Sequence, residues 1–189
     1  MKKILYKQLN IEGLSPKERR QAEHDCVYGL LAKELSLYGR SIGEVVKDKN
    51  GKPFIPGDDI FFSLSHASGL CVCAVCDRAV GVDAEALRPK NKDTILRLAR
   101  RYLTEAEQSR LKDSSDSLSE AFLSIWVKKE SIVKRSGVGI IGMKDADSEN
   151  ADLYFFSLPG YVLSLCTEAD GPLEIIDYSD SIEHKKSGF

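Results

Sequence analysis

The segment spanning residues 59–87 constrains the fold of this chain more than any other part of the sequence. It reads DIFFSLSHASGLCVCAVCDRAVGVDAEAL and contains three apolar runs, separated by short turns at residues 68–69 and 77–78. Short apolar runs that alternate with turn residues are typical of consecutive antiparallel strands. The segment therefore predicts a three-stranded antiparallel meander.

Capping residues predict the helices on either side of this meander. Ser15, Pro16 and Glu18 form a capping box with a proline in the first turn, so a helix begins at residue 16. Thr104 and Glu107 form a second capping box, which opens a helix that runs to residue 111. Helices are also predicted over residues 91–103 and 119–137. Strands are predicted over residues 153–158, 161–168 and 173–178. Residues 112–119 are expected to form a polar loop, and residues 183–189 to be loosely structured.

A four-residue repeat raises the question of internal duplication. FFSL occurs at residues 61–64 and again at 155–158, and each copy precedes a turn and an apolar strand that contains cysteine. Shared strand preference and duplication of an α/β half both explain this match. A duplicated chain would place a site at the junction of its halves, where pockets often lie.

Composition excludes two classes of protein. The net charge is −2, so the overall charge provides no basic surface for nucleic acid. No segment reaches the roughly 18 consecutive apolar residues of a membrane span, and MKKILYKQLN at residues 1–10 lacks the apolar core of a signal peptide. We therefore expect no contact with nucleic acid or membrane.

The cysteines indicate a reducing compartment. The chain has five of them, an odd number that fits unpaired thiols in the cytoplasm. Cys73 and Cys76 form a C-x-x-C sequence, which occurs in redox motifs and zinc sites. Because strand positions three apart face opposite sides and no second C-x-x-C or C-x-x-H exists, buried free thiols are the preferred interpretation.

Two acidic residues stand one position apart at the end of the third apolar run. Asp83 and Glu85 face the same side of a strand, because strand side chains alternate. Two unit charges about 4 Å apart repel each other by roughly 4 kcal/mol at an effective dielectric constant near 20. Such a pair requires open water, a basic partner, a shared proton or a metal ion.

Three other polar groups are candidates for a site, and each has a purely structural alternative. Glu130 and Lys134 are four residues apart on the long helix, at the edge of its apolar stripe, and could equally form a surface ion pair. Ser65 and His66 end the first apolar run, where a single histidine is often structural. Lys52 lies in a turn between glycine and proline, where most lysines are only solvated.

The order of these groups along the chain resembles the 4′-phosphopantetheinyl transferase superfamily, of the longer, Sfp-like type. That family is marked by a G-[IV]-D-x-E segment and a W-[ST]-x-K-E-[AS]-x-x-K helix, which here read GVDAE at residues 81–85 and WVKKESIVK at 126–134. Val127 replaces the usual serine or threonine. Supporting similarities are GKP at 51–53, the Ser-His pair at 65–66, RYLTEAE at 101–107 and KRSGVGI at 134–140.

The resemblance implies a fold and an activity. The expected fold is α+β, a pseudo-duplicated chain with lobes at residues 1–88 and 89–189, each a small antiparallel sheet packed with helices, and an active site between them. The expected activity is Mg²⁺-dependent transfer of 4′-phosphopantetheine from coenzyme A to a serine of an apo acyl or peptidyl carrier protein. The products would be the holo-carrier and 3′,5′-ADP, and both halves of the site on one polypeptide predict a monomer.

The resemblance also implies roles for individual residues. Asp83, Glu85 and Glu130 would bind Mg²⁺, and Glu130 and Lys134 would act in catalysis. The residues expected to hold coenzyme A are Lys52, Ser65, His66, Asp83, Glu130 and Lys134. A basic patch at Arg97, Arg100 and Arg101, or the region around Lys128, Lys134 and Arg135, would dock an acidic carrier helix.

Two alternatives to this activity stay open. Family members usually carry an arginine in the first helix that helps to hold the adenosine end of coenzyme A, and DCVYGLLAK at residues 25–33 has none. This departure favours a weakened relative that binds coenzyme A or a carrier without transfer. The other alternative is an unrelated metal phosphohydrolase, which would release phosphate or phosphopantetheine and add no mass to a carrier.

Overall fold

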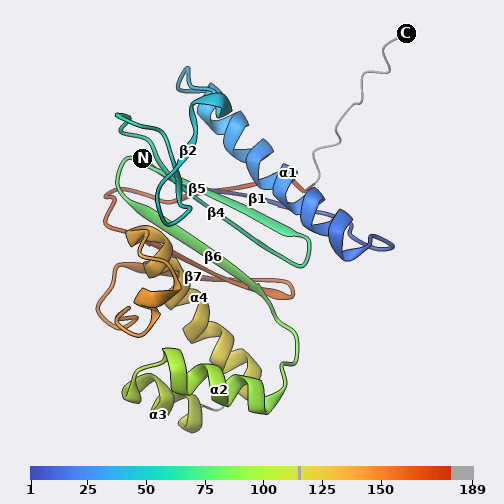
Figure 1. Cartoon of the computed structure of the whole chain (residues 1–189), viewed down its shortest axis with the longest axis vertical. Helices are drawn as coiled ribbons and strands as arrows, with labels where there is room; N and C mark the ends of the chain where they lie inside the picture. Colours follow the sequence, from blue (N-terminus) through green and yellow to red (C-terminus); the bar gives the residue numbers. More distant parts are fainter. Residues whose placement is uncertain (115, 180–189) are drawn as a thin grey trace.

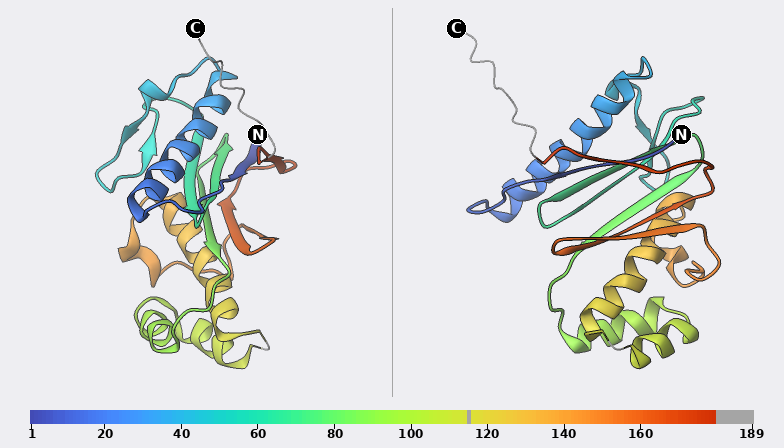
Figure 2. Two further views of the ribbon diagram at one scale, coloured as in Figure 1. Left: turned by 90° about the vertical axis from the view of Figure 1, so that its right-hand side faces the viewer. Right: turned by 180° about the vertical axis from the view of Figure 1, so that it is seen from behind.

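The computed structural model of the chain describes residues 1–114 and 116–179, and arranges them in four layers (Figure 1). Helix α1 (Pro16–Ser36) covers a four-stranded sheet, a three-stranded sheet lies against the other face of the first, and helix α4 (Leu118–Ser136) packs on the second sheet. Figure 2 shows the same layers from two further sides. Each interface between layers buries its own apolar cluster.

The four-stranded sheet has the order β4-β5-β1-β9. Its strands are β1 (Lys2–Gln8), β4 (Phe61–Ala67), β5 (Leu70–Cys76) and β9 (Glu174–Asp177). Every pair is antiparallel except β1 with β9, which are parallel. Leu31 and Leu35 of α1 share a buried cluster with Leu5, Phe62 and Cys73 of this sheet, which places the first helix over β4, β5 and β1.

The predicted three-stranded meander is wrong at its third strand. β4 and β5 form the expected hairpin, but β6 (Val80–Ala86) joins β8 (Tyr161–Thr167) and β7 (Leu153–Leu158) in the second sheet, in the order β6-β8-β7. Both edges of β5 are already occupied, by β4 on one side and by β1 on the other. The turn at residues 77–78 therefore carries the chain from one sheet to the next.

Serine hydroxyls bridge the two sheets where β6 passes β4. The backbone N–H of Val82 donates to Ser63 Oγ at 3.0 Å, and that of Ala84 donates to Ser65 Oγ at 3.2 Å. These side chains satisfy backbone groups at the free edge of β6, which would otherwise be buried without partners. β4 and β6 are thereby held side by side.

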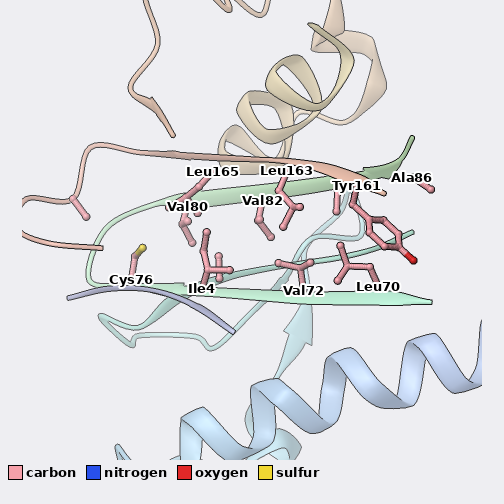
Figure 3. Packing of buried hydrophobic residues seen from close by; sticks show 13 residues of the cluster. Ile4, Leu70, Val72, Cys76, Val80, Val82, Ala86, Tyr161, Leu163 and Leu165 are labelled. Atoms are coloured by element: carbon pink, nitrogen blue, oxygen red, sulfur yellow. The ribbon is translucent and has the colours of Figure 1, made fainter. Parts of the chain in front are cut away.

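The core between the sheets is built from the inward faces of both (Figure 3). Val80 and Val82 of β6 point toward Ile4 and Val72 of the first sheet. Because strand side chains alternate, this packing turns positions 81, 83 and 85 of β6 toward α4. The predicted same-face arrangement of the two acidic residues follows from this core.

The four predicted helices are confirmed, and their boundaries differ from the predicted ones by at most two residues. Ser15 and Glu18 form the capping box of α1, and Thr104 and Glu107 form that of α3 (Glu105–Asp113). α2 spans Lys92–Tyr102, and α4 ends at Gly137, which adopts the left-handed conformation with φ 70°. α3 extends two residues into the predicted polar loop, and the predicted loose residues 183–189 lie outside the described part of the chain.

Smaller elements connect these layers. A short ribbon of β2 (Val46–Lys47) and β3 (Pro53–Phe54) follows the 3-10 helix η1 (Ile42–Glu44), and a second 3-10 helix, η2 (Ile140–Met143), follows α4. No helix within the described residues is both long enough and apolar enough to traverse a bilayer. No disulfide joins any of the five cysteines, all of which lie in the described part of the chain, and Cys73 and Cys76 are buried in β5.

The α+β class is confirmed, and the internal duplication stays a prediction. The division at residue 88 also stays a prediction, and the strands are shared across it. β6 precedes residue 88 but pairs with β8, and β9 follows residue 88 but pairs with β1. Both FFSL copies lie in the first strand of a hairpin, β4–β5 or β7–β8.

Candidate functional site

Gly81 brings the acidic face of β6 against helix α4. A Cβ atom at this position would lie 1.9 Å from the carbonyl oxygen of Ser131 and 2.3 Å from the backbone nitrogen of Arg135. Only glycine allows so close an approach of strand and helix. The glycine of GVDAE therefore sets the distance at which Asp83 and Glu85 face the helix.

Asp83 has a basic partner on α4. Lys134 Nζ lies 2.7 Å from Asp83 Oδ1 and also donates to Ser65 Oγ at 3.0 Å. The Ser65 hydroxyl in turn donates to Asp83 Oδ1 at 3.0 Å. The ion pair joins β6 to α4 with the carboxylate of Asp83 buried, while the Lys134 side chain is 31% exposed.

Glu85 and Glu130 are less well compensated. Burial is the main reason that the pKa of each carboxyl is raised, and the nearby charge of Asp83 raises both further. Lys90 opposes this effect at Glu85, where its Nζ lies 3.6 Å from Oε2, and Lys134 opposes it at Glu130. Three carboxylates thus share a region with two ammonium groups, which leaves an excess of negative charge.

A pocket of about 360 Å³ opens where β4, β6 and α4 meet. It brings together five of the six residues predicted to hold coenzyme A and all three predicted metal ligands. Its lining includes Ser65, His66, Asp83, Glu85, Trp126, Glu130 and Lys134. A second pocket of about 290 Å³ adjoins it and shares Leu64, Glu130 and Lys134 with the first.

The sixth residue, Lys52, lines the second pocket but not the first. Its ammonium group donates to the carbonyl oxygen of Arg135 at 2.6 Å and to that of Val80 at 3.4 Å, and burial lowers its pKa. A cation that binds the last carbonyls of a helix stabilises the helix end. This contact agrees with a structural role for Lys52, and its predicted contact with a phosphate stays a prediction.

Lys129, inside the WVKKE motif, is part of the core. It is 0% exposed, its Nζ lies 2.8 Å from a carboxylate oxygen of Glu107, and it donates to the carbonyl oxygen of Ala146 at 2.7 Å. The pair links α4 to the N-terminal turn of α3. The motif therefore combines a structural lysine with Glu130 and Lys134, which border the pocket.

Two polar residues beside the pocket were not predicted from the sequence. Glu23 of α1 lies with Oε2 3.3 Å from His66 Nδ1, and Lys90 follows β6 next to Glu85. The only sequence signal for Glu23 was its position four residues before Val27 on the buried face of the helix. Lys90 carried no such signal.

The carboxylates fit a hard cation by their chemistry. Mg²⁺ prefers oxygen ligands, and Asp83, Glu85 and Glu130 supply them around one pocket. Within residues 1–114 and 116–179, no three or more His, Cys, Asp or Glu side chains are already gathered to hold a metal ion. The predicted ligand set therefore stays a prediction.

The site lies within a region that matches a known family. A sequence model of the 4′-phosphopantetheinyl transferase superfamily matches residues 79–171. The chain is 28% identical over 149 residues to a 4′-phosphopantetheinyl transferase of Bacillus subtilis, which covers 71% of this chain and 65% of the relative. It is 36% identical over 93 residues to 4′-phosphopantetheinyl transferase Sfp of Bacillus subtilis strain 168. This match covers 48% of this chain and 39% of the relative.

A third relative is 4′-phosphopantetheinyl transferase AcpT of Salmonella typhimurium, which is 34% identical over 110 residues, or 57% of this chain and 55% of the relative. The chain thus spans less than two thirds of the length of each of these three proteins. The matched region contains β6 and α4, with the GVDAE and WVKKE motifs that meet at the pocket. Residues 79–171 of this chain therefore belong to the 4′-phosphopantetheinyl transferase superfamily.

Proposed function

We propose that this protein transfers 4′-phosphopantetheine from coenzyme A to a serine of an apo acyl or peptidyl carrier protein. The observation that carries the proposal is the convergence of Ser65, His66, Asp83, Glu130 and Lys134 on one pocket from three separate elements. In the reaction, the serine oxygen forms a bond to the pantetheine-side phosphorus of the pyrophosphate. The bond from that phosphorus to the bridging oxygen breaks, and 3′,5′-ADP leaves.

The residues of the pocket suit this reaction. Lys134 is the nearest cation to Asp83, and its ammonium group supplies positive charge for phosphoryl oxygens that gain negative charge during transfer. Glu130 borders both pockets, directly beside Lys134, and is the proposed acceptor of the serine proton, directly or through a water molecule. His66 is exposed in the pocket wall, where it would contact a phosphate.

A divalent cation would complete the charge balance. Asp83, Glu85 and Glu130 would hold Mg²⁺, which would neutralise phosphoryl charge when bound. The raised pKa values of Glu85 and Glu130 agree with a site that has too few cations of its own. The remaining proposed properties are a monomeric state and action in the cytoplasm.

A carrier-modification assay tests the proposal. The protein is incubated with coenzyme A, Mg²⁺ and a panel of apo-carriers, and carrier masses are measured. We expect one or more carriers to gain the mass of phosphopantetheine. Release of free phosphate or phosphopantetheine without any carrier gaining mass would favour the phosphohydrolase, and coenzyme A binding without turnover would favour the binding-only relative.

Replacing Asp83 by alanine should reduce transfer about 100-fold, because the variant loses one carboxylate of the cation site and the partner of Lys134. The rate is measured with saturating Mg²⁺, and circular dichroism checks the fold. Asp77→Ala is a matched control, since Asp77 lies in the exposed turn before β6 and outside both pockets. Transfer by Asp83→Ala at the wild-type rate would contradict the proposed site.

Reversing two charges on α2 should weaken use of the carrier. Arg97 and Arg100 are exposed, and neither forms an ion pair within the described residues. We expect Arg97→Glu combined with Arg100→Glu to raise the carrier KM about tenfold and to leave coenzyme A binding unchanged. Reversing Lys47 and Lys49 gives the same change in net charge elsewhere. If neither the charge reversal nor added salt changes the carrier KM, the carrier docks on another surface.

A further inference from the structure

The carboxylate of Glu23 lies behind the pocket, and the proposed chemistry does not use it. Glu23 belongs to α1 and is only 3% exposed. A buried carboxylate is costly unless its oxygens have partners. Here the two oxygens have different ones, because Oε1 accepts the backbone N–H of Gly69 at 2.7 Å and Oε2 lies 3.3 Å from His66 Nδ1.

The turn between β4 and β5 is shaped so that both partners reach this carboxylate. Ser68 and Gly69 adopt positive φ angles of 49° and 94°. A Cβ atom at Gly69 would lie 2.9 Å from the carbonyl oxygen of Leu9, so a larger residue does not fit there. The turn therefore has one conformation, and Glu23 holds both its backbone and the histidine that precedes it.

This contact determines which nitrogen of His66 is left for the pocket. In the neutral ring that donates to a carboxylate, and equally in the charged ring, Nδ1 carries the proton directed at Glu23. The Nε2 atom is then the one free to meet a ligand. The His66 side chain is 45% exposed and lines the pocket that also contains Asp83 and Lys134.

We propose that Glu23 is a positioning residue, which holds the His66 ring so that Nε2 faces the pocket, where the Nε2–H of the charged ring donates to a phosphate oxygen of coenzyme A. The identity of the ligand rests on the proposed function, whereas the orientation of the ring rests only on the contacts of Glu23. The first helix would thus contribute to the site through a buried carboxylate, although it carries no arginine at residues 25–33.

Glu23→Gln tests this role with little change in shape. Its amide oxygen still accepts the Gly69 N–H, but its NH₂ group faces Nδ1 and favours the ring form with the proton on Nε2. ¹⁵N NMR at a pH where the ring is neutral should show protonated Nδ1 in the wild type and protonated Nε2 in the variant. Calorimetry with coenzyme A and Mg²⁺ should show binding weakened about tenfold, or about 1.4 kcal/mol, because the glutamine NH₂ cannot accept from Nδ1–H and the variant therefore disfavours the charged ring that donates to the phosphate.

Glu34→Gln is the matched control. Glu34 is another buried carboxylate of α1. It binds Lys3 Nζ at 2.8 Å, and neither residue lines either pocket. Its replacement should lower stability but leave the His66 ring form and coenzyme A affinity unchanged. This comparison separates the loss of a buried charge on the helix from the loss of the contact with His66.

A double-mutant cycle with His66→Ala decides whether Glu23 acts on coenzyme A binding through the His66 ring or only by stabilising the fold. If Glu23 acts through the ring, Glu23→Gln will not weaken coenzyme A binding further once His66 is alanine. An equal loss in both backgrounds, or an unchanged ring form in Glu23→Gln, would overturn the proposal. Should the wild type bind no coenzyme A, the proposed function fails, and the NMR result still decides whether Glu23 sets the ring.

Discussion

Replacing Lys129 by methionine is expected to lower the free energy of unfolding by about 4 kcal/mol, because removing one partner of a buried ion pair leaves the other charge uncompensated. Lys129 is 0% exposed and Glu107 is 2% exposed, so water cannot replace the lost contact. Urea unfolding followed by the fluorescence of Trp126, the single tryptophan of the chain, measures the change.

Two further variants test whether the loss of stability comes from the Lys129–Glu107 ion pair. Lys128→Met alters the neighbouring half-buried lysine, which forms no ion pair in the described residues, and should change stability by less than about 1 kcal/mol. Glu107→Gln in the Lys129→Met background should restore part of the loss, because it removes the orphaned charge and keeps the capping box. A fully stable Lys129→Met protein would show that the pair contributes little.

The same pair predicts a pH dependence. Burial alone would raise the pKa of Glu107, but hydrogen bonds from Lys129, Ser148 and the Thr104 backbone outweigh it, and the folded-state pKa is lowered. The resulting stabilisation is present above the unfolded-state pKa and is lost as pH falls through the folded-state value. The stability difference between the wild type and Lys129→Met should therefore narrow below about pH 4.

Replacing Gly81 by alanine should cost about 3 kcal/mol or more of stability, because the added methyl group would lie 1.9 Å from the carbonyl oxygen of Ser131. Both atoms in conflict belong to backbone, so no side-chain rotation relieves the contact. The helix must shift away from β6, which moves Glu130 and Lys134 relative to Asp83. The folded fraction should therefore also lose transfer activity.

Gly29→Ala is the control for this substitution. Gly29 lies within α1, and a Cβ atom there would meet nothing within 4 Å. Alanine at an open helical position should raise stability by about 0.5–1 kcal/mol, since it restricts the unfolded chain and favours the helix. Equal stability of the two alanine variants would mean that β6 and α4 can separate without cost.

Helices and hairpins were predictable from the sequence, whereas the partners of the strands were not. The capping residues Ser15 and Thr104 act within one turn of chain, so local chemistry defines their helices. β6 looked like the third strand of a meander because its neighbour in sequence is β5. Its partner is β8, which lies about 80 residues away, and no local pattern specifies so distant a pairing.

In the site as well, features set by local sequence were predictable, and contacts between distant elements were not. The alternation of β6 correctly put Asp83 and Glu85 on one face, and the spacing of α4 correctly put Glu130 near the edge of its buried stripe. Sequence could not show that Lys134 would pair with Asp83, that Lys129 would be buried, or that Glu23 would reach His66. These contacts depend on which layers meet, and that is decided by tertiary packing.

The parallel pairing of β1 with β9 has a consequence for biosynthesis. A ribosome makes β1 before β9, which is the last strand of the described residues, so one edge of β1 stays open until β9 has been made. An open strand edge is a template for intermolecular pairing, and contacts between distant residues form slowly. The sheet from which Ser65 and His66 reach the pocket is therefore complete only once β9 has been made and has paired with β1.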